Sequence, residues 1–261
     1  MPTGAGEKRV IQSLERSVQI LDYLAENPGG ARLSVISRNL GLNKSTAFSL
    51  ISSMKELRLL RQDEDSGKYA LGVRLLQYGY CVEKSMDIIS IAQPQLNHLA
   101  EQYEETAHMA VLSGSNIIYL AKAESAKTIH MTTRIGSVMP AYCSSLGKML
   151  LSQLPNNKLF AVLSEIEFVQ RTSNTILTPE RLLDELDLAR KEHCAFDREE
   201  CDLGVFCVSS AVYNAQNECV AAISISVSIG KASLIGEDAM KASVISAAEN
   251  ISKRLGCTLF S

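Results

Sequence analysis

Apolar residues in the first 60 positions recur at three- and four-residue steps, the spacing of helices that bury one face. These steps predict three helices, over 11–25, 34–40 and 44–57. Pro28-Gly29-Gly30 ends the first helix. We expect Ser34 to cap the free N–H groups of the second helix and Gly41 to end it in a sharp turn.

A β-hairpin is predicted directly after the third helix. Two short segments, 59–62 and 68–71, flank the polar turn 63–67. Three helices followed by a hairpin predict a winged helix-turn-helix domain over residues 1–75. Further helical spacing predicts a helical linker over residues 76–104.

From residue 105 the pattern changes to strands separated by helices. Strands are predicted at 108–113, 117–123, 205–213 and 218–229, and helices at 144–153, 180–192 and 240–255. The last two strands form a hairpin. The sequence therefore predicts a second domain of α+β or α/β class over residues 105–261, of the kind that senses a small molecule.

Composition narrows the class of protein. The chain is 46% hydrophobic but has neither an apolar run that could span a membrane nor an apolar secretion signal, so we expect a cytoplasmic protein with no membrane partner. Seven Cys and four His lack CxxC or CxxH spacing, which predicts reduced thiols, no metal and no cofactor. Residues 1–75 carry 11 Lys and Arg against 8 Asp and Glu, whereas the whole chain has a net charge of −3. This asymmetry suits a small module beside DNA phosphates.

The third helix has the two faces that a DNA-reading helix needs, one apolar and one small and polar. We assign Ser45, Ser49 and Ser52 to the major groove. At the start of this helix we expect Lys44 and Thr46 to bind a phosphate. The flanking cations Arg38, Arg61 and Lys68 are expected to bind neighbouring phosphates. An alternative is that the serines are only solvated, as on many helical hairpins that end in Gly. The hairpin after the third helix favours the winged helix.

Seven sequence stretches, distributed along nearly the whole chain, follow the order and spacing of a known protein family. They are SLERSVQILDYLAE, GLNKST, KYALGVRLLQYG, ETAHMAVLSGSNIIYLAKAES, TRIGSVMPAYCSSLGKMLL, DREECDLGVFCVSSAVYNAQNECVAAISISVS and ISKRLG. In order and spacing they resemble the IclR family of bacterial transcription regulators. The resemblance implies a winged helix followed by a GAF-like effector-binding domain, assembled as a homodimer or homotetramer on palindromic double-stranded DNA. The resemblance also implies a role in gene regulation. Most members repress genes for the uptake or breakdown of small acids, sugar acids or aromatic compounds, and some members activate genes.

One stretch departs from the family pattern. Many members have His-Ala-Thr or Tyr-Ser-Thr before the Gly-Lys of the pocket helix, where this chain has Tyr142-Cys143-Ser144-Ser145. The YCS and DREE stretches resemble a subgroup that senses sugar-acid metabolites. The effector and the sign of regulation stay open at this point.

Strand alternation predicts a polar cavity in the second domain. Along 220–229, Ser224, Ser226 and Ser228 share one face, and the opposite face is apolar. Hydroxyls in a row can donate to or accept from a carbonyl or carboxylate. Cys207 shares a face with Ser209 on the preceding strand. Alternatively, the serines face water and Cys207 is a small core residue.

The predicted effector is a small carboxylate or carbonyl metabolite. By resemblance, the family's effector-contacting positions are Gly147, Asp197, Cys207, Ser224 and Ser226. Ser144 and Ser145 precede Gly147 at the start of a helix, where free N–H groups can hold a carboxylate. We expect Asp197 to accept from a ligand hydroxyl and Tyr142 to cover the cavity.

Two other functions are compatible with the cysteines. A redox-sensing DNA-binding regulator would use Cys194, Cys201 and Cys207, but the acidic residues around them oppose a lowered thiol pKa. A hydrolase would use Cys201 or Cys207 with His193, yet no GxSxG-like elbow or metal motif lies nearby. The sequence therefore favours a regulator, and we expect no catalytic residue and no enzyme activity.

Overall fold

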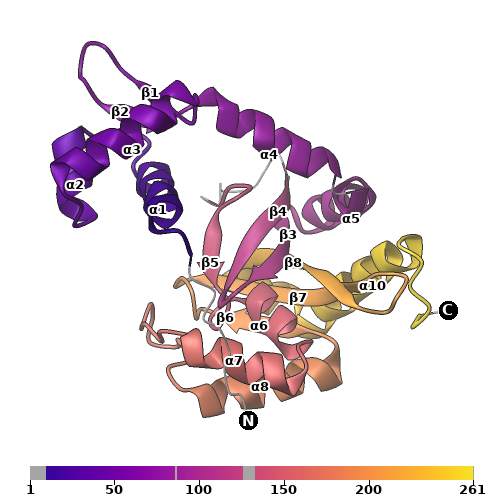
Figure 1. Ribbon diagram of the computed structural model, residues 1–261. Coiled ribbons are helices and arrows are strands. Elements are labelled where there is room, and N and C mark those ends of the chain that lie inside the picture. The colour runs from indigo at the N-terminus through magenta and orange to yellow at the C-terminus, as the bar shows by residue number, and fades with distance from the viewer. Residues whose placement is uncertain (1–9, 86, 126–132, 261) are drawn as a thin grey trace, which may run out of the picture. The chain divides into compact units, whose positions relative to one another are not determined.

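The computed structural model describes residues 10–85, 87–125 and 133–260, and Figure 1 traces its elements. Residues 1–9 of the predicted DNA-binding segment lie outside the described residues. The chain divides into two compact units, residues 1–85 and residues 86–261.

The first unit is three helices and a hairpin, followed by a further helix. Its elements are α1 (Gln12–Glu26), α2 (Leu33–Asn39), α3 (Lys44–Glu56), β1 (Leu60–Gln62), β2 (Tyr69–Leu71) and α4 (Val73–Ser85). Ile20, Ile36 and Ile51 bring the first three helices together in one core, which Leu60 and Tyr69 extend to the hairpin. This is the winged helix-turn-helix predicted from the sequence.

The start of α2 differs from the expectation. Arg32 is the N-cap residue, no side chain caps the helix, and Ser34 lies inside it with its side chain exposed. The prediction that Ser34 caps this helix was therefore wrong, because the helix begins one residue earlier. Gly41 follows the helix at φ +61°, a left-handed conformation that glycine adopts without strain.

The second unit is built on a six-stranded antiparallel sheet in the order β5-β4-β3-β8-β7-β6. The strands are β3 (Thr106–Ser113), β4 (Asn116–Glu124), β5 (Val138–Pro140), β6 (Ala195–Arg198), β7 (Val205–Tyr213) and β8 (Cys219–Ser228). The helices are α5 (Asp87–Tyr103), α6 (Ser145–Ser152), α7 (Asn156–Glu165), α8 (Pro179–Glu192), α9 (Ile229–Ile235) and α10 (Glu237–Arg254).

The sheet separates two apolar cores. Helices α5 and α10 pack with residues such as Ile223 and Ile225 in one core, whereas α6, α7 and α8 pack with Ala222 and Ala211 in the other. Helix α6 contacts strands β6, β7 and β8 directly, so its N-terminus meets the face of the sheet.

The segment 76–104, predicted as a linker, is divided between the two units. Helix α4 belongs to the first unit and α5 to the second. Ala92, Leu96 and Leu99 of α5 are buried in the core shared with the sheet and α10. The apolar stripe that suggested a linker helix is thus a packing face of the second unit.

Candidate effector pocket and DNA interface

Polar side chains from three neighbouring strands share one face of the sheet. Cys207 of β7 pairs with Ser226 of β8, and Ser226 pairs with Thr106 of β3. Two residues along β8, Ser224 pairs with His108 of β3. Directly opposed residues point to the same face, so this register brings the predicted serines beside His108.

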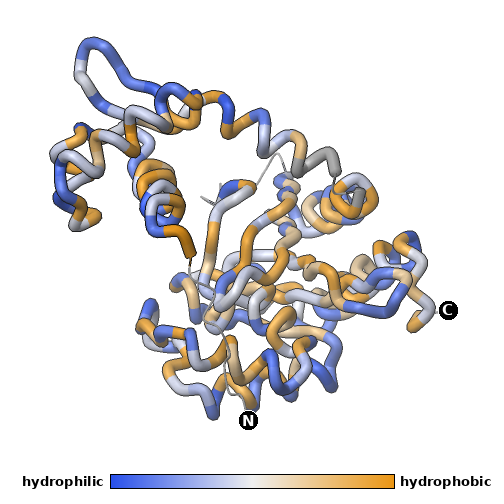
Figure 2. The backbone as a smooth tube through the Cα atoms, viewed as in Figure 1, coloured by the Kyte–Doolittle hydropathy of each residue, from blue (hydrophilic) through white to orange (hydrophobic). Residues whose placement is uncertain are grey.

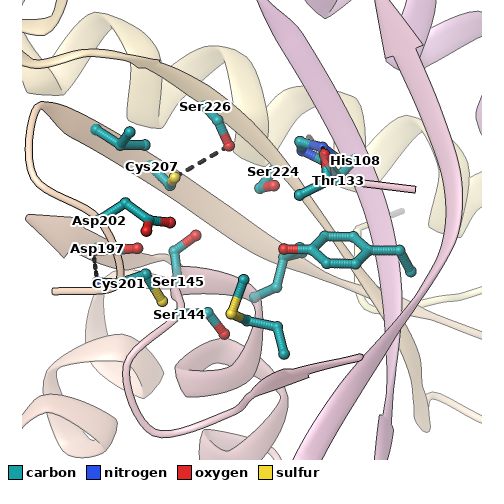
Figure 3. A pocket seen from close by; sticks show the side chains of 14 residues that line it. His108, Thr133, Ser144, Ser145, Asp197, Cys201, Asp202, Cys207, Ser224 and Ser226 are labelled. Atoms are coloured by element: carbon teal, nitrogen blue, oxygen red, sulfur yellow. Dashed lines mark hydrogen bonds between the residues drawn. The ribbon is translucent and has the colours of Figure 1, made fainter. Parts of the chain in front are cut away.

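A cavity of about 50 Å³ lies over this face. In Figure 3 Ser224 and Ser226 stand next to each other, with Asp197 and Cys201 across the cavity from His108 and Thr133. The lining residues are His108, Tyr119, Thr133, Met139, Ser144, Ser145, Leu146, Asp197, Cys201, Asp202, Val205, Cys207, Ser224 and Ser226. This lining contains no Lys or Arg among the described residues.

The structure brings six of the eight predicted pocket residues to the cavity. Ser144, Ser145, Asp197, Cys207, Ser224 and Ser226 line it. Ser228, the third hydroxyl of the predicted row, is exposed and caps α9 by accepting from the Lys231 N–H.

Gly147 and Tyr142 lie elsewhere. Gly147 packs against the backbone of Ala141, where a Cβ atom would overlap the carbonyl group. The Tyr142 hydroxyl donates to the Val169 carbonyl (2.7 Å) and accepts from the Val169 N–H (3.0 Å), and the side chain lines a separate depression with Arg171. The structure therefore gives both residues a packing environment away from the cavity lining.

The N-terminus of α6 presents backbone donors to the cavity. Ser144 is the N-cap, and its hydroxyl oxygen accepts from the Gly147 N–H at 3.1 Å. The N–H groups of Ser145 and Leu146 occupy the first two helical positions, which have no acceptor four residues earlier in the helix. Both residues line the cavity, and the helix dipole favours negative charge there.

Asp197 is the buried carboxyl group of the pocket. Its Oδ1 accepts from the Glu200 N–H at 2.7 Å and the Cys201 N–H at 3.4 Å. Burial outweighs these hydrogen bonds and raises the pKa of Asp197 to about 7. Near neutral pH the carboxyl group is therefore partly protonated and can donate a hydrogen bond as well as accept one.

A buried ion pair lies behind the pocket. Lys148 Nζ of α6 is 2.5 Å from Glu200 Oε1 and 3.6 Å from Glu185 Oε2 of α8. Glu200 lies two residues after the end of β6 and also donates its N–H to Asp197, so the pair ties the segment that carries Asp197 to α6. Burial raises the pKa of Glu200 despite the nearby ammonium group.

Sequence reasoning missed several lining residues, above all His108. Its Nε2 lies 2.7 Å from Thr133 Oγ1, and its ring packs against Tyr119 at a centroid distance of 5.1 Å. Burial lowers the pKa of His108 to about 3, so the imidazole is neutral near pH 7. The pairing of β3 with β8 places His108 beside Ser224. The alternation of polar and apolar residues along β3 alone does not reveal this pairing.

The cysteines are arranged differently from both thiol hypotheses. Cys194 belongs to the core on the other face of the sheet, whereas Cys207 Sγ donates to Ser226 Oγ at 3.1 Å. Cys201 Sγ lies 3.3 Å from the sulfur of Cys143. Burial raises the pKa of Cys207, and burial together with the Cys143 contact raises that of Cys201, which disfavours the reactive thiolate. His193 is exposed at the C-terminal end of α8.

The predicted DNA-contacting residues lie on the surface of the first unit. Ala47, Ile51 and Met54 hold α3 on its core, and Ser45 and Ser49 are exposed on another face. Among the other candidates, Thr46 and Ser52 are half-buried, and the exposed ones are Lys44 of α3, Arg38 of α2, Arg61 of β1 and Lys68 next to β2.

A winged helix joined to a unit with a small cavity lined by polar side chains is typical of ligand-responsive, DNA-binding transcription regulators. Two family models match the chain: the IclR helix-turn-helix domain over residues 13–64, and the C-terminal domain of bacterial transcriptional regulator IclR over residues 81–253. The chain belongs to the IclR family of bacterial transcriptional regulators.

Individual relatives extend this match over most of the chain. It is 33% identical to the HTH-type transcriptional regulator XynR of Escherichia coli K12, covering 83% of this chain and 86% of XynR. It is 32% identical to the acetate operon repressor of Salmonella typhimurium, covering 95% of this chain and 91% of that repressor.

A solved structure shares the fold over nearly the whole chain. It is an IclR homologue from Microbacterium hydrocarbonoxydans in complex with 4-hydroxybenzoate, at 21% identity and a TM-score of 0.80, covering 94% of this chain and 99% of that one. None of the helices in the described part of the chain combines the length and apolar character that a membrane crossing requires.

Proposed function

We propose that this regulator represses a catabolic operon and that a small organic acid, sugar acid or carbonyl metabolite controls it from the sheet cavity. The observation that carries the proposal is the convergence of the α6 N-terminus, Ser224, Ser226 and Asp197 on one cavity. Repression is supported by the acetate operon repressor, which is 32% identical to this chain.

The size and chemistry of the cavity favour a short ligand. A water molecule needs roughly 10–15 Å³ of such space, so a cavity of about 50 Å³ suits a few heavy atoms. The Microbacterium homologue binds an aromatic acid, 4-hydroxybenzoate. For this chain we propose an acid of two to four carbons, with its carboxylate on the N–H groups of Ser145 and Leu146. Ser224, Ser226 and Asp197 then bond a neighbouring carbonyl or hydroxyl.

The proposed DNA complex uses the exposed side chains of the first unit. Ser45, Ser49 and Ser52 contact bases, and the phosphates are bound by Arg38, Lys44, Thr46, Arg61 and Lys68. The operator is a palindrome because the protein binds as a homodimer or homotetramer. We propose that it does so in the cytoplasm.

An apolar surface on the first unit supports the oligomer. Ile11, at the start of α1, is 69% exposed, and Leu14 and Val18 on the same helix are 62% and 50% exposed. The start of this helix is orange in the hydropathy colouring of Figure 2. These residues recur at three- and four-residue steps, so they form one stripe that a second copy of the chain can cover.

A thermal-shift screen with short 2-oxo and hydroxy acids tests the effector proposal, because a ligand that binds only the folded state raises the melting temperature. Titration calorimetry then compares the wild type with Ser224→Ala and Ser226→Ala. Each lost hydrogen bond leaves the ligand's buried carbonyl or hydroxyl without that partner, at a cost of about 1–3 kcal/mol, so we expect affinity to fall roughly five- to a hundred-fold.

Ser228→Ala is the matched control, since this hydroxyl lies on the same strand but caps α9. It should bind the acid like the wild type. Unchanged affinity in both Ser224→Ala and Ser226→Ala would contradict the pocket assignment.

A further inference from the structure

An aromatic side chain interrupts the polar surface of α3. Phe48 is 57% exposed, although Ala47 beside it is fully buried and holds the helix on its core. Phe48 lies three residues after Ser45 and four residues before Ser52, which makes it their neighbour on the helix surface. Its ring therefore adjoins the serines assigned to the major groove.

Leaving an aromatic ring in water forgoes the roughly 1.5–3 kcal/mol that its burial would contribute. Two partners could cover it, DNA or a second copy of the chain. The other exposed large apolar residues described in this unit lie at the start of α1 and on it, just past α3, and on α4; they are Val10, Ile11, Leu14, Val18, Leu57, Val73, Leu76, Tyr78 and Tyr80. Phe48 instead has Lys44 and Ser45 in the preceding turn of α3, both exposed. Cationic and hydroxyl neighbours suit a nucleic-acid surface, so the local chemistry favours DNA.

The major groove offers one apolar group that such a ring can contact. Thymine carries a 5-methyl group there, and the other three bases carry no methyl group. We propose that Phe48 packs on the methyl group of a thymine and makes the protein prefer thymine at one position of each operator half-site. The inference rests on the proposed placement of α3 in the major groove.

Uracil replacement tests this contact one methyl group at a time. The purified full-length protein first selects duplexes from a random DNA pool. Each thymine of the selected duplex is then replaced by deoxyuridine, which keeps the hydrogen-bonding atoms and removes only the methyl. Because burial of a methyl-sized group contributes about 0.8 kcal/mol, one replacement in a single half-site should weaken wild-type binding about three- to five-fold.

The variants separate the ring from the rest of the helix. Phe48→Ala should bind the thymine and uracil duplexes equally and should bind the thymine duplex more weakly than the wild type. Phe48→Leu, which keeps apolar volume, should retain part of the preference for thymine. The matched control is Leu57→Ala, because Leu57 is 52% exposed just past the end of α3. It should keep the full uracil penalty.

Three outcomes would overturn the inference. They are a wild type that tolerates uracil at every position, a Phe48→Ala variant that keeps the penalty, and a Phe48→Ala variant whose mass in solution changes, which would assign Phe48 to a contact between copies. Failure of the wild type to select any duplex would instead contradict the proposed DNA-binding function, and this inference with it.

Discussion

Asp197 and His108 face the same cavity, and burial shifts their pKa values in opposite directions. Burial raises the pKa of Asp197 to about 7 and lowers that of His108 to about 3, because in both cases the apolar surroundings penalise the charged form. Near neutral pH the cavity therefore holds a neutral imidazole and a carboxyl group that still carries a proton part of the time. This lowers the repulsion that a bound carboxylate would otherwise meet from Asp197.

The raised pKa of Asp197 predicts a pH-dependent stability difference between the wild type and Asp197→Asn. Between about pH 4 and pH 7 the folded wild type holds a proton that the unfolded chain releases. Its free energy of unfolding therefore falls as pH rises, by up to about 1.4 kcal/mol per pH unit from this group. The variant lacks the group, so its stability relative to the wild type should increase through this window.

Denaturant unfolding at several pH values measures that difference. Asp202→Asn is the control, because Asp202 lines the same cavity with its side chain exposed. A constant difference between the wild type and Asp197→Asn from pH 4 to pH 7 would refute the buried, protonated carboxyl.

At the scale of elements, α6 is fixed by close packing at its first turn. Gly147 is there because a Cβ atom would fall 2.6 Å from the carbonyl carbon of Ala141 and still closer to its oxygen. All residues of α6 are buried, so the helix has little room to shift away. The donors of Ser145 and Leu146 are therefore held in place over the sheet.

Gly147→Ala should destabilise the protein by at least about 2 kcal/mol, since overpacking against backbone has no flexible side chain to absorb it. Gly230→Ala is the matched control, because Gly230 lies in α9 of the same unit and a Cβ atom added there would meet no other atom within 4 Å. It should leave stability within about 1 kcal/mol of the wild type. Equal unfolding midpoints for the two variants in urea would contradict this packing role.

Periodicity predicted most of the long elements but missed the ten-residue helix α7. Of the short strands, β1 and β2 were predicted because a polar turn joins them. The helix α3 and the hairpin of β7 and β8 follow from apolar spacing over nine or more residues. The three-residue strand β5 and the four-residue strand β6 are too short to show a period, and the sequence did not predict them. Their positions depend on pairing with β4 and β7, which is tertiary information.

The site was predictable along a strand but not across strands. Alternation on β8 put Ser224 and Ser226 opposite the apolar row of Ile223 and Ile225, as the structure has them. His108 joined them through the register of β3 with β8, which no single-strand pattern contains. Family resemblance pointed to Gly147 as an effector contact, which stays a prediction, and its surroundings also pack it against Ala141.

At the scale of the whole molecule, the apolar cores respect the boundary between the two units. The core of the winged helix is drawn from residues 20–71, and both cores of the sheet unit are drawn from residues 88–255. Each unit thus buries apolar surface of its own, the usual condition for independent folding.

A fragment of residues 86–261 should therefore unfold cooperatively and keep the wild-type affinity for the acid found by thermal shift, because the whole cavity lining lies within it. It should not bind the duplex selected by the full chain, since α3 is missing. In the full chain, coupling between the two sites is reciprocal: if the acid weakens operator binding by some factor, saturating operator must weaken acid binding by the same factor. Calorimetric titration of the acid with and without operator should show this factor in the full chain and a factor of one in the fragment. A fragment that still binds the duplex, or that melts without cooperativity, would contradict the division of labour between the two units.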